Sequence, residues 1–264
     1  MTATPKFETV RYEPKGPICH IVLNRPEKLN AANDQLVEEV NDALFEFDAD
    51  PELQVAILSG AGRAFCSGAD VRQRQLRTRD ELKRLGGPAG RRSRENGLGE
   101  TVNWKPVIAA VLGWALGLGY SLSQSCDLVV AAQGAQLQIR EVQRGLASGQ
   151  HWAATWLWTG CRLANQVALT GRMFTAEEDL QPGMVNRVVP GAELMSAAEA
   201  LAAEIIQNPP LAVRANVRVM RWFVNEMQRQ SRYYSQGLGL HLSEDFQESA
   251  RAFVEKRKPV FKGR

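Results

Sequence analysis

The stretch GWALGLGYSLSQSCDLVVA (residues 113–131) joins a glycine-rich turn to an apolar strand. Gly113, Gly117 and Gly119 lead into a short polar run, and an apolar segment follows at residues 126–132. A turn of this kind at the start of a helix can present backbone N–H groups to a negative charge, because the first N–H groups of a helix have no partner within it. The stretch is therefore typical of an anion-stabilising turn, although a packed glycine turn without chemistry has the same pattern.

Apolar runs like this one recur along the chain and alternate with segments of helical spacing. Residues 33–47 place their apolar side chains on one helical face, and Asn33 can cap that helix. Strands alternating with helices predict an α/β fold. The expected strands cover residues 18–26, 54–62, 106–113, 126–132 and 184–190.

The strand pattern stops near residue 191, so we divide the chain into an α/β core over residues 1–191 and a helical C-terminal region over residues 192–264. Such a tail packs either on its own core or on a neighbouring subunit, and the sequence does not decide between them. The expected helices of this region cover residues 193–206, 210–229 and 243–257.

Composition excludes several classes of protein. The chain has 264 residues, of which 44% are hydrophobic and 23% charged, as in ordinary globular proteins. The net charge of +3 does not by itself indicate a nucleic-acid partner. Three scattered histidines and four cysteines without C-x-x-C spacing predict neither a metal site nor a disulfide framework.

We expect neither secretion nor membrane insertion. The N-terminal residues MTATPKFETV lack the apolar core of a signal peptide, so we predict a cytoplasmic protein. Residues 107–126 carry no charge, but only residues 107–118 are strongly apolar. Because an apolar run of this length is too short to span a bilayer as a helix, we expect it in the core.

Residues 71–95 contain nine basic residues against three acidic ones. The simpler interpretation is a solvated surface segment. The alternative is a lid that meets a polyanionic ligand, because the segment directly follows a second glycine turn, GRAFCSGAD (residues 62–70). Two such turns facing each other could hold one developing oxyanion, with each donor lowering a barrier by roughly 3–4 kcal/mol.

Four motifs occur in order along nearly the whole chain: NRPEKLNA (24–31), AFCSGAD (64–70), ALGLGYSLSQSCDLVVA (115–131) and FVEKRKPVFK (253–262). Together they resemble the enoyl-CoA hydratase/isomerase family, the crotonase superfamily. The resemblance implies a crotonase-like spiral of ββα units and a helical C-terminal region that builds homotrimers, often paired into hexamers. It implies acyl-CoA substrates and no cofactor beyond their CoA moiety.

The resemblance also assigns residues to a site. The oxyanion hole would consist of the backbone N–H groups of Ala69 and Leu118. The CoA-binding residues would be Arg25, Lys28, Ser67, Ala69, Phe253 and Lys256, the last from the same or a neighbouring subunit.

Hydratases of the family usually carry two glutamates, and the corresponding positions here are Ser121 and Glu141. We predict Glu141 as general acid/base, with a pKa raised by its apolar neighbours, and Ser121 as a residue that orients water or substrate. The alternative is a surface carboxylate paired with Arg140 or Arg144. Arg140 replaces the family's usual proline, and unless the segment is extended its charge would lower the pKa of Glu141.

The leading hypothesis is an acyl-CoA hydratase/isomerase with a single glutamate. Serine followed by glutamate at these two positions is also similar to hydroxycinnamoyl-CoA hydratase-lyases. A third hypothesis, motivated by the basic segment, is a crotonase-fold binding protein without catalysis. Residues 145–160 lack the family's usual Pro–Gly stretch and introduce His151, Trp152, Trp156 and Trp158 instead. The tryptophans either pack in the core or line an aromatic acyl pocket.

Overall fold

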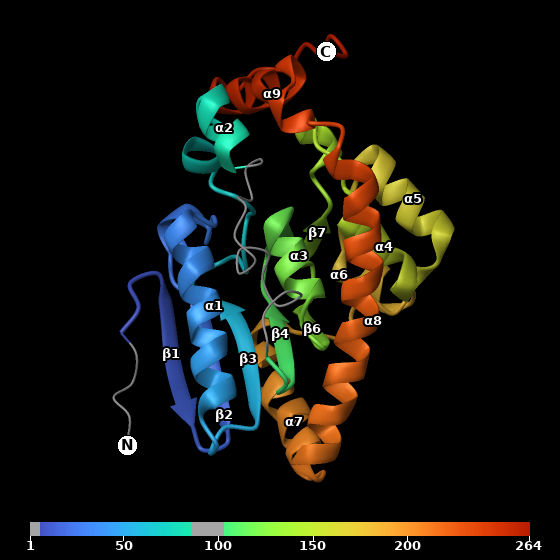
Figure 1. Ribbon diagram of the computed structural model, residues 1–264. Helices are drawn as coiled ribbons and strands as arrows, with labels where there is room; N and C mark the ends of the chain where they lie inside the picture. The colour runs from blue at the N-terminus through green and yellow to red at the C-terminus, as the bar shows by residue number, and fades with distance from the viewer. Residues whose placement is uncertain (1–5, 86–102) are drawn as a thin grey trace.

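The computed structural model describes residues 6–85 and 103–264, so the predicted basic segment is described only as far as residue 85. A six-stranded sheet forms the centre, in the order β1-β2-β3-β4-β6-β9 (Figure 1). β1 runs antiparallel to β2, and the remaining neighbours are parallel. The strands are β1 (Val10–Lys15), β2 (Ile18–Leu23), β3 (Val55–Gly60), β4 (Val107–Val111), β6 (Leu128–Ala132) and β9 (Arg187–Val189).

The inner strands are buried on both faces, which explains their continuous apolar sequences. In β3, Ala56 and Leu58 belong to the cluster that includes α1 (Asp34–Ala49), and Val55 and Ile57 belong to the cluster on the other face. That second cluster contains Leu194, Ala198 and Ala202 of helix α7 (Leu194–Ile206). The predicted α/β class is confirmed, and every predicted strand contains an observed one.

A second, three-stranded sheet was not predicted. It consists of β5 (Trp114–Leu116), β7 (Gln136–Gln138) and β8 (Met173–Thr175). Strands of three residues are too short to show a period in sequence. β4 and β5 are followed by the short helix α3 (Leu118–Gln124), so strand, strand and helix succeed one another in a ββα unit.

Helices form the rest of the described chain. The helix expected at 210–229 continues to Gln236 in α8, and the one expected at 243–257 ends at Val254 in α9, shortly before Lys256 takes a positive φ of 55°. The proposed boundary at residue 191 falls just after β9. Besides α1, α3 and α7, the described helical elements are α2 (Arg79–Leu85), α4 (Gly149–Thr159), α5 (Cys161–Thr170), α6 (Ala176–Leu180), α8 (Pro210–Gln236), α9 (Glu244–Val254), the π-helical turn Val71–Gln75 and the 3-10 turns Pro26–Lys28, Val142–Arg144, Gly191–Glu193 and Leu240–Leu242.

The uncharged segment at 107–126 forms β4, β5 and α3, and β4 is completely buried. None of the helices in the described ranges combines the length and apolar character needed to cross a membrane.

The tryptophans of residues 145–160 differ in burial, since Trp158 packs against the main core cluster and Trp156 is 39% exposed. Trp152 and Trp156 stack on α4 with ring centroids 5.9 Å apart, and Trp152 donates its indole N–H to Asn165 of α5 at 2.7 Å.

A buried ion pair attaches α8 to the central sheet. Arg221 donates to both carboxylate oxygens of Asp127, at 3.0 Å and 2.5 Å, and also to Asn103 and the carbonyl of Lys105. Asp127 in turn accepts from the N–H of Val107 at the start of β4, at 2.7 Å. The two charged side chains are only 8% and 6% exposed.

Replacing Arg221 by alanine would leave the Asp127 carboxylate buried without its counter-ion. We expect Arg221→Ala to lower the free energy of unfolding by about 3–5 kcal/mol, measured by chemical denaturation. The matched control is Arg229→Ala on the same helix, whose guanidinium is 71% exposed beside Glu226 and whose loss should leave the midpoint nearly unchanged. Equal effects of the two substitutions would contradict this account of how α8 is held.

Candidate functional site

Two glycine turns meet, backbone against backbone, at one wall of a pocket of about 1210 Å³. The N–H of Cys66 donates to the carbonyl of Trp114 at 2.9 Å, and the N–H of Leu116 donates back to Cys66 at 3.0 Å. This approach requires glycine: a Cβ atom at Gly119 would lie 2.2 Å from the carbonyl oxygen of Cys66. Gly68 has a φ of 103°, and its Cβ atom would lie 2.8 Å from the carbonyl oxygen of Leu116.

Ala69 and Leu118, the predicted oxyanion-hole residues, both line this pocket. Within the described chain, the backbone N–H groups of these two residues donate to no protein acceptor. Their neighbours in sequence do: the N–H of Gly117 donates to the carbonyl of Gln138, and the N–H of Asp70 donates to the carbonyl of Ala32, each at 2.9 Å. Leu118 is the first residue of α3, where helix geometry leaves the N–H unpaired. Two unpaired donors at the meeting point of the turns can bind one oxygen together.

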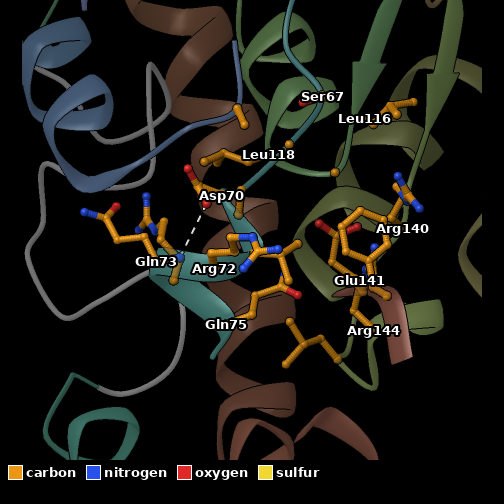
Figure 2. A pocket seen from close by; sticks show the side chains of 18 of the residues that line it. Ser67, Asp70, Arg72, Gln73, Gln75, Leu116, Leu118, Arg140, Glu141 and Arg144 are labelled. Carbon is orange, nitrogen blue, oxygen red and sulfur yellow. Dashed lines mark hydrogen bonds between the residues drawn. The ribbon is translucent and has the colours of Figure 1, made fainter. Parts of the chain in front are cut away.

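Glu141 lies on the opposite side of the pocket from the turn that carries Asp70 and Arg72 (Figure 2). It follows β7 and has helical backbone angles (φ −55°, ψ −45°), so the segment is not extended at this residue. Its side chain is 15% exposed, and its Oε1 lies 3.2 Å from Nε2 of His151. Its Oε2 is buried and has no hydrogen-bond partner among the residues that the structure describes.

The pKa of Glu141 lies below its ordinary value of 4.5. Burial raises this pKa, but the charge of His151, its hydrogen bond and the backbone N–H groups of Arg140 and Glu141 lower it by more. The prediction of a raised pKa was therefore wrong, because the histidine was not expected beside the carboxylate. Burial also lowers the pKa of Arg140, and Glu141 opposes that effect.

The pairing of Glu141 with Arg140 or Arg144, considered from sequence, is not what the structure shows. Arg144 is turned toward α9: it donates to the carbonyl of Ser249 at 3.2 Å, and its guanidinium lies 4.2 Å from the ring centroid of Phe253. Burial and the charge of Arg140 lower the pKa of Arg144 to about 10.

The predicted CoA-binding residues share the pocket, which is lined by Arg25, Lys28, Ser67, Ala69, Phe253 and Lys256. Phe253 and Lys256 belong to the same chain as the rest, because α9 folds over its own pocket and contacts the 3-10 turn that follows Glu141. In Figure 1, α9 lies beside α2 at one end of the molecule.

Ser121 is the predicted site residue that the structure does not bring to the pocket wall. It is buried in α3 at 7% exposure and is not among the described residues that line the pocket. Conversely, His151 lines the pocket and was not predicted as a site residue. The one feature of the sequence that singled out His151 is its position in residues 145–160, where the family's usual Pro–Gly stretch is missing. Trp152, Trp156 and Trp158 are absent from the described lining, while Trp114 is part of it.

Comparison with known proteins supports the resemblance drawn from the motifs. The family model described as enoyl-CoA hydratase/isomerase matches residues 13–264. The mevalonyl-coenzyme A hydratase of Aspergillus fumigatus is 34% identical over 94% of this chain and 93% of its own. The carnitinyl-CoA dehydratase of Salmonella heidelberg is 37% identical over 97% of this chain and 99% of its own.

Solved structures show the same fold. The carnitinyl-CoA hydratase of Mycobacterium avium superimposes with a TM-score of 0.82 at 32% identity, over 98% of this chain and 100% of the other. An enoyl-CoA hydratase of Mycobacterium avium subsp. paratuberculosis gives a TM-score of 0.80 at 26% identity, over 97% and 100% of the two chains. With its motifs, pocket and fold in agreement, this chain belongs to the enoyl-CoA hydratase/isomerase family of enzymes and has the crotonase-like α/β fold.

Proposed function

We propose that this protein is an acyl-CoA hydratase/isomerase that acts on an enoyl-CoA thioester through an enolate, with Glu141 as general acid/base. The observation that carries the proposal is the joint placement of two unpaired N–H donors and one buried carboxylate in a single pocket. The donors, on Ala69 and Leu118, stabilise the charge that develops on the thioester oxygen. The carboxylate supplies and removes the proton that the enolate chemistry requires.

The rest of the pocket suits the CoA moiety. Arg25, Lys28 and Lys256 line it and offer positive charge to the CoA phosphates, while Phe253 offers an aromatic surface. Ser67 accompanies them, with its hydroxyl 3.5 Å from the carbonyl of Lys28.

We also propose that the chain assembles into homotrimers or hexamers through its helical region. Large apolar side chains on α8 are exposed, and exposed apolar surface is common where proteins associate. They include Leu211, Val219, Met220, Trp222 and Phe223.

Glu141→Gln keeps the shape of the side chain and removes its ability to carry a proton. We expect kcat to fall by about 10²–10⁴-fold on whichever substrate of a panel is active: crotonyl-CoA, a 3-enoyl-CoA or a hydroxycinnamoyl-CoA. Product analysis separates hydration, double-bond shift and hydratase-lyase cleavage. The control, Glu204→Gln, changes a carboxylate that is 60% exposed on α7 and should keep wild-type turnover.

Wild-type rates for Glu141→Gln on every active substrate would refute Glu141 as the proton carrier. Absence of turnover on the whole panel, combined with salt-sensitive RNA binding and no CoA affinity, would instead favour the non-catalytic binding protein.

Gly119→Ala tests the oxyanion hole without touching a side chain of the site. The added Cβ, 2.2 Å from the carbonyl oxygen of Cys66, must push the two turns apart. Misplacing one donor should lower kcat by about 10²–10³-fold. Gly237→Ala is the control, since beyond its chain neighbours no described atom lies within 4 Å of its added Cβ. Steady-state kinetics of both variants decides the point, and a wild-type kcat for Gly119→Ala would argue against the assigned hole.

A further inference from the structure

His151 is a titratable side chain of the pocket wall to which the proposed function gives no role. It is the third residue of α4 and is only 6% exposed. Its Nε2 lies 3.2 Å from Oε1 of Glu141, although ten positions separate the two residues in sequence. The contact therefore depends on how the N-terminal end of α4 is placed against the segment that follows β7.

Aromatic packing and a hydrogen-bonded chain hold the histidine in place. Its ring meets the ring of Tyr120 edge-on, with centroids 6.3 Å apart, and Tyr120 meets Phe174 in the same way at 6.1 Å. The Tyr120 hydroxyl is 2.7 Å from the hydroxyl of Thr155, which donates to the backbone carbonyl of His151 at 2.7 Å. Because Tyr120 belongs to α3, the helix that begins at Leu118, this packing ties the histidine to the oxyanion turn.

We propose that His151 is a positioning residue for the reaction: its Nε2–H fixes Oε1 of Glu141, so that Oε2 is the atom that exchanges the proton with the substrate. The inference rests on the proposed function. Its geometric basis is the difference between the two oxygens of one carboxylate, since Oε1 contacts the imidazole and Oε2 is buried with no hydrogen-bond partner. The arrangement resembles that of other catalytic sites in which a second side chain orients the group that carries the proton.

A carboxylate that is ionised at rest begins as a base. Oε2 takes a proton from Cα, and the electron pair of the broken C–H bond moves to the thioester oxygen held by Ala69 and Leu118. When the substrate is a 3-hydroxyacyl thioester, the enolate expels the β-hydroxyl, which leaves as water with the proton from Oε2, and hydration of an enoyl thioester is the reverse of these steps. When the substrate is a 3-enoyl thioester, the proton on Oε2 is instead delivered to Cγ. Either route returns Glu141 to its starting state and consumes no part of His151.

Other charged groups face the same space. Arg140 and Arg144 flank Glu141 in sequence, Arg232 lines the pocket from α8, and His241 lines it from the 3-10 turn Leu240–Leu242. The guanidinium charges of Arg140, Arg144 and Arg232 also favour the carboxylate, whereas burial lowers the pKa of His241 and so favours its neutral form. Removing His151 therefore leaves part of the stabilisation of the Glu141 carboxylate in place. We expect the pKa of Glu141 to rise only in part.

The test compares pH profiles of kcat/KM for wild type, His151→Gln and His151→Leu on the most active acyl-CoA. His151→Gln keeps a donor but removes the charge, whereas His151→Leu removes both. With His151 gone, the effect of burial on the pKa of Glu141 meets less opposition. We expect the acid limb to move to higher pH by about one unit or more in His151→Leu, and by less in His151→Gln.

The matched control is His20→Gln. His20 is also buried, at 4% exposure, and its Nε2 lies 3.3 Å from Glu199, but neither residue is in the pocket lining. A purely structural role for His151 would lower stability or the amplitude of the profile without moving its acid limb, as we expect for His20→Gln. If His151→Leu fails to fold, the pH profile of His151→Gln is compared with that of the wild type instead.

An acid limb at the wild-type pH in folded His151 variants would overturn the inference, while an inactive Glu141→Gln leaves the proposed function intact. Turnover that survives Glu141→Gln would overturn the proposed function instead. Titration of carbon-13-labelled glutamate carboxyls, with Glu141→Gln assigning the resonance, reads the same shift without any substrate. An unchanged titration in His151→Leu would also count against the inference.

Discussion

The close backbone approach of residues 66–68 to residues 114–119 is the constraint on which the site depends. Gly68 and Gly119 permit it, because any side chain at either position would meet a carbonyl oxygen at less than 3 Å. The approach leaves the N–H groups of Ala69 and Leu118 at the surface of one pocket. It also fixes the start of α3, and with it Tyr120, against which the His151 ring packs. One backbone contact therefore orders the proposed oxyanion hole and supports His151 beside Glu141.

Electrostatics then distinguishes the two sides of the pocket. Arg25 lies 3.4 Å from Asp70 on one side, near the residues proposed to bind CoA. Glu141 pairs with His151 rather than with either neighbouring arginine. Burial raises the pKa of Glu141, but the charge and hydrogen bond of His151, together with the backbone N–H groups of Arg140 and Glu141, lower it by more. A serine at position 121 is compatible with this arrangement, since the proton can travel on one carboxylate.

The sequence predicted the inner strands well because strands buried on both faces are continuously apolar, as in β3 and β4. It did not reveal β5, β7 or β8, which have three residues each, or the edge strand β1, whose side chains are mostly not buried. The motifs and the spacing from them predicted Ala69, Leu118 and Glu141 as site residues, and all three line the pocket. His151 lacked such a pattern, since it meets Glu141 only when α4 is packed. For the same reason the sequence could not show that α9 covers the pocket of its own chain or that the pKa of Glu141 is lowered.

The central claim is that Glu141 exchanges a proton with Cα of a thioester held by Ala69 and Leu118. It is tested most directly by nuclear magnetic resonance of a saturated acyl-CoA in deuterated water, where no later step of the reaction can occur. The account predicts that the wild-type protein incorporates deuterium at Cα. In Glu141→Gln the rate of incorporation should be lower by a factor of about 10² or more. Incorporation at the same rate by both proteins would contradict it.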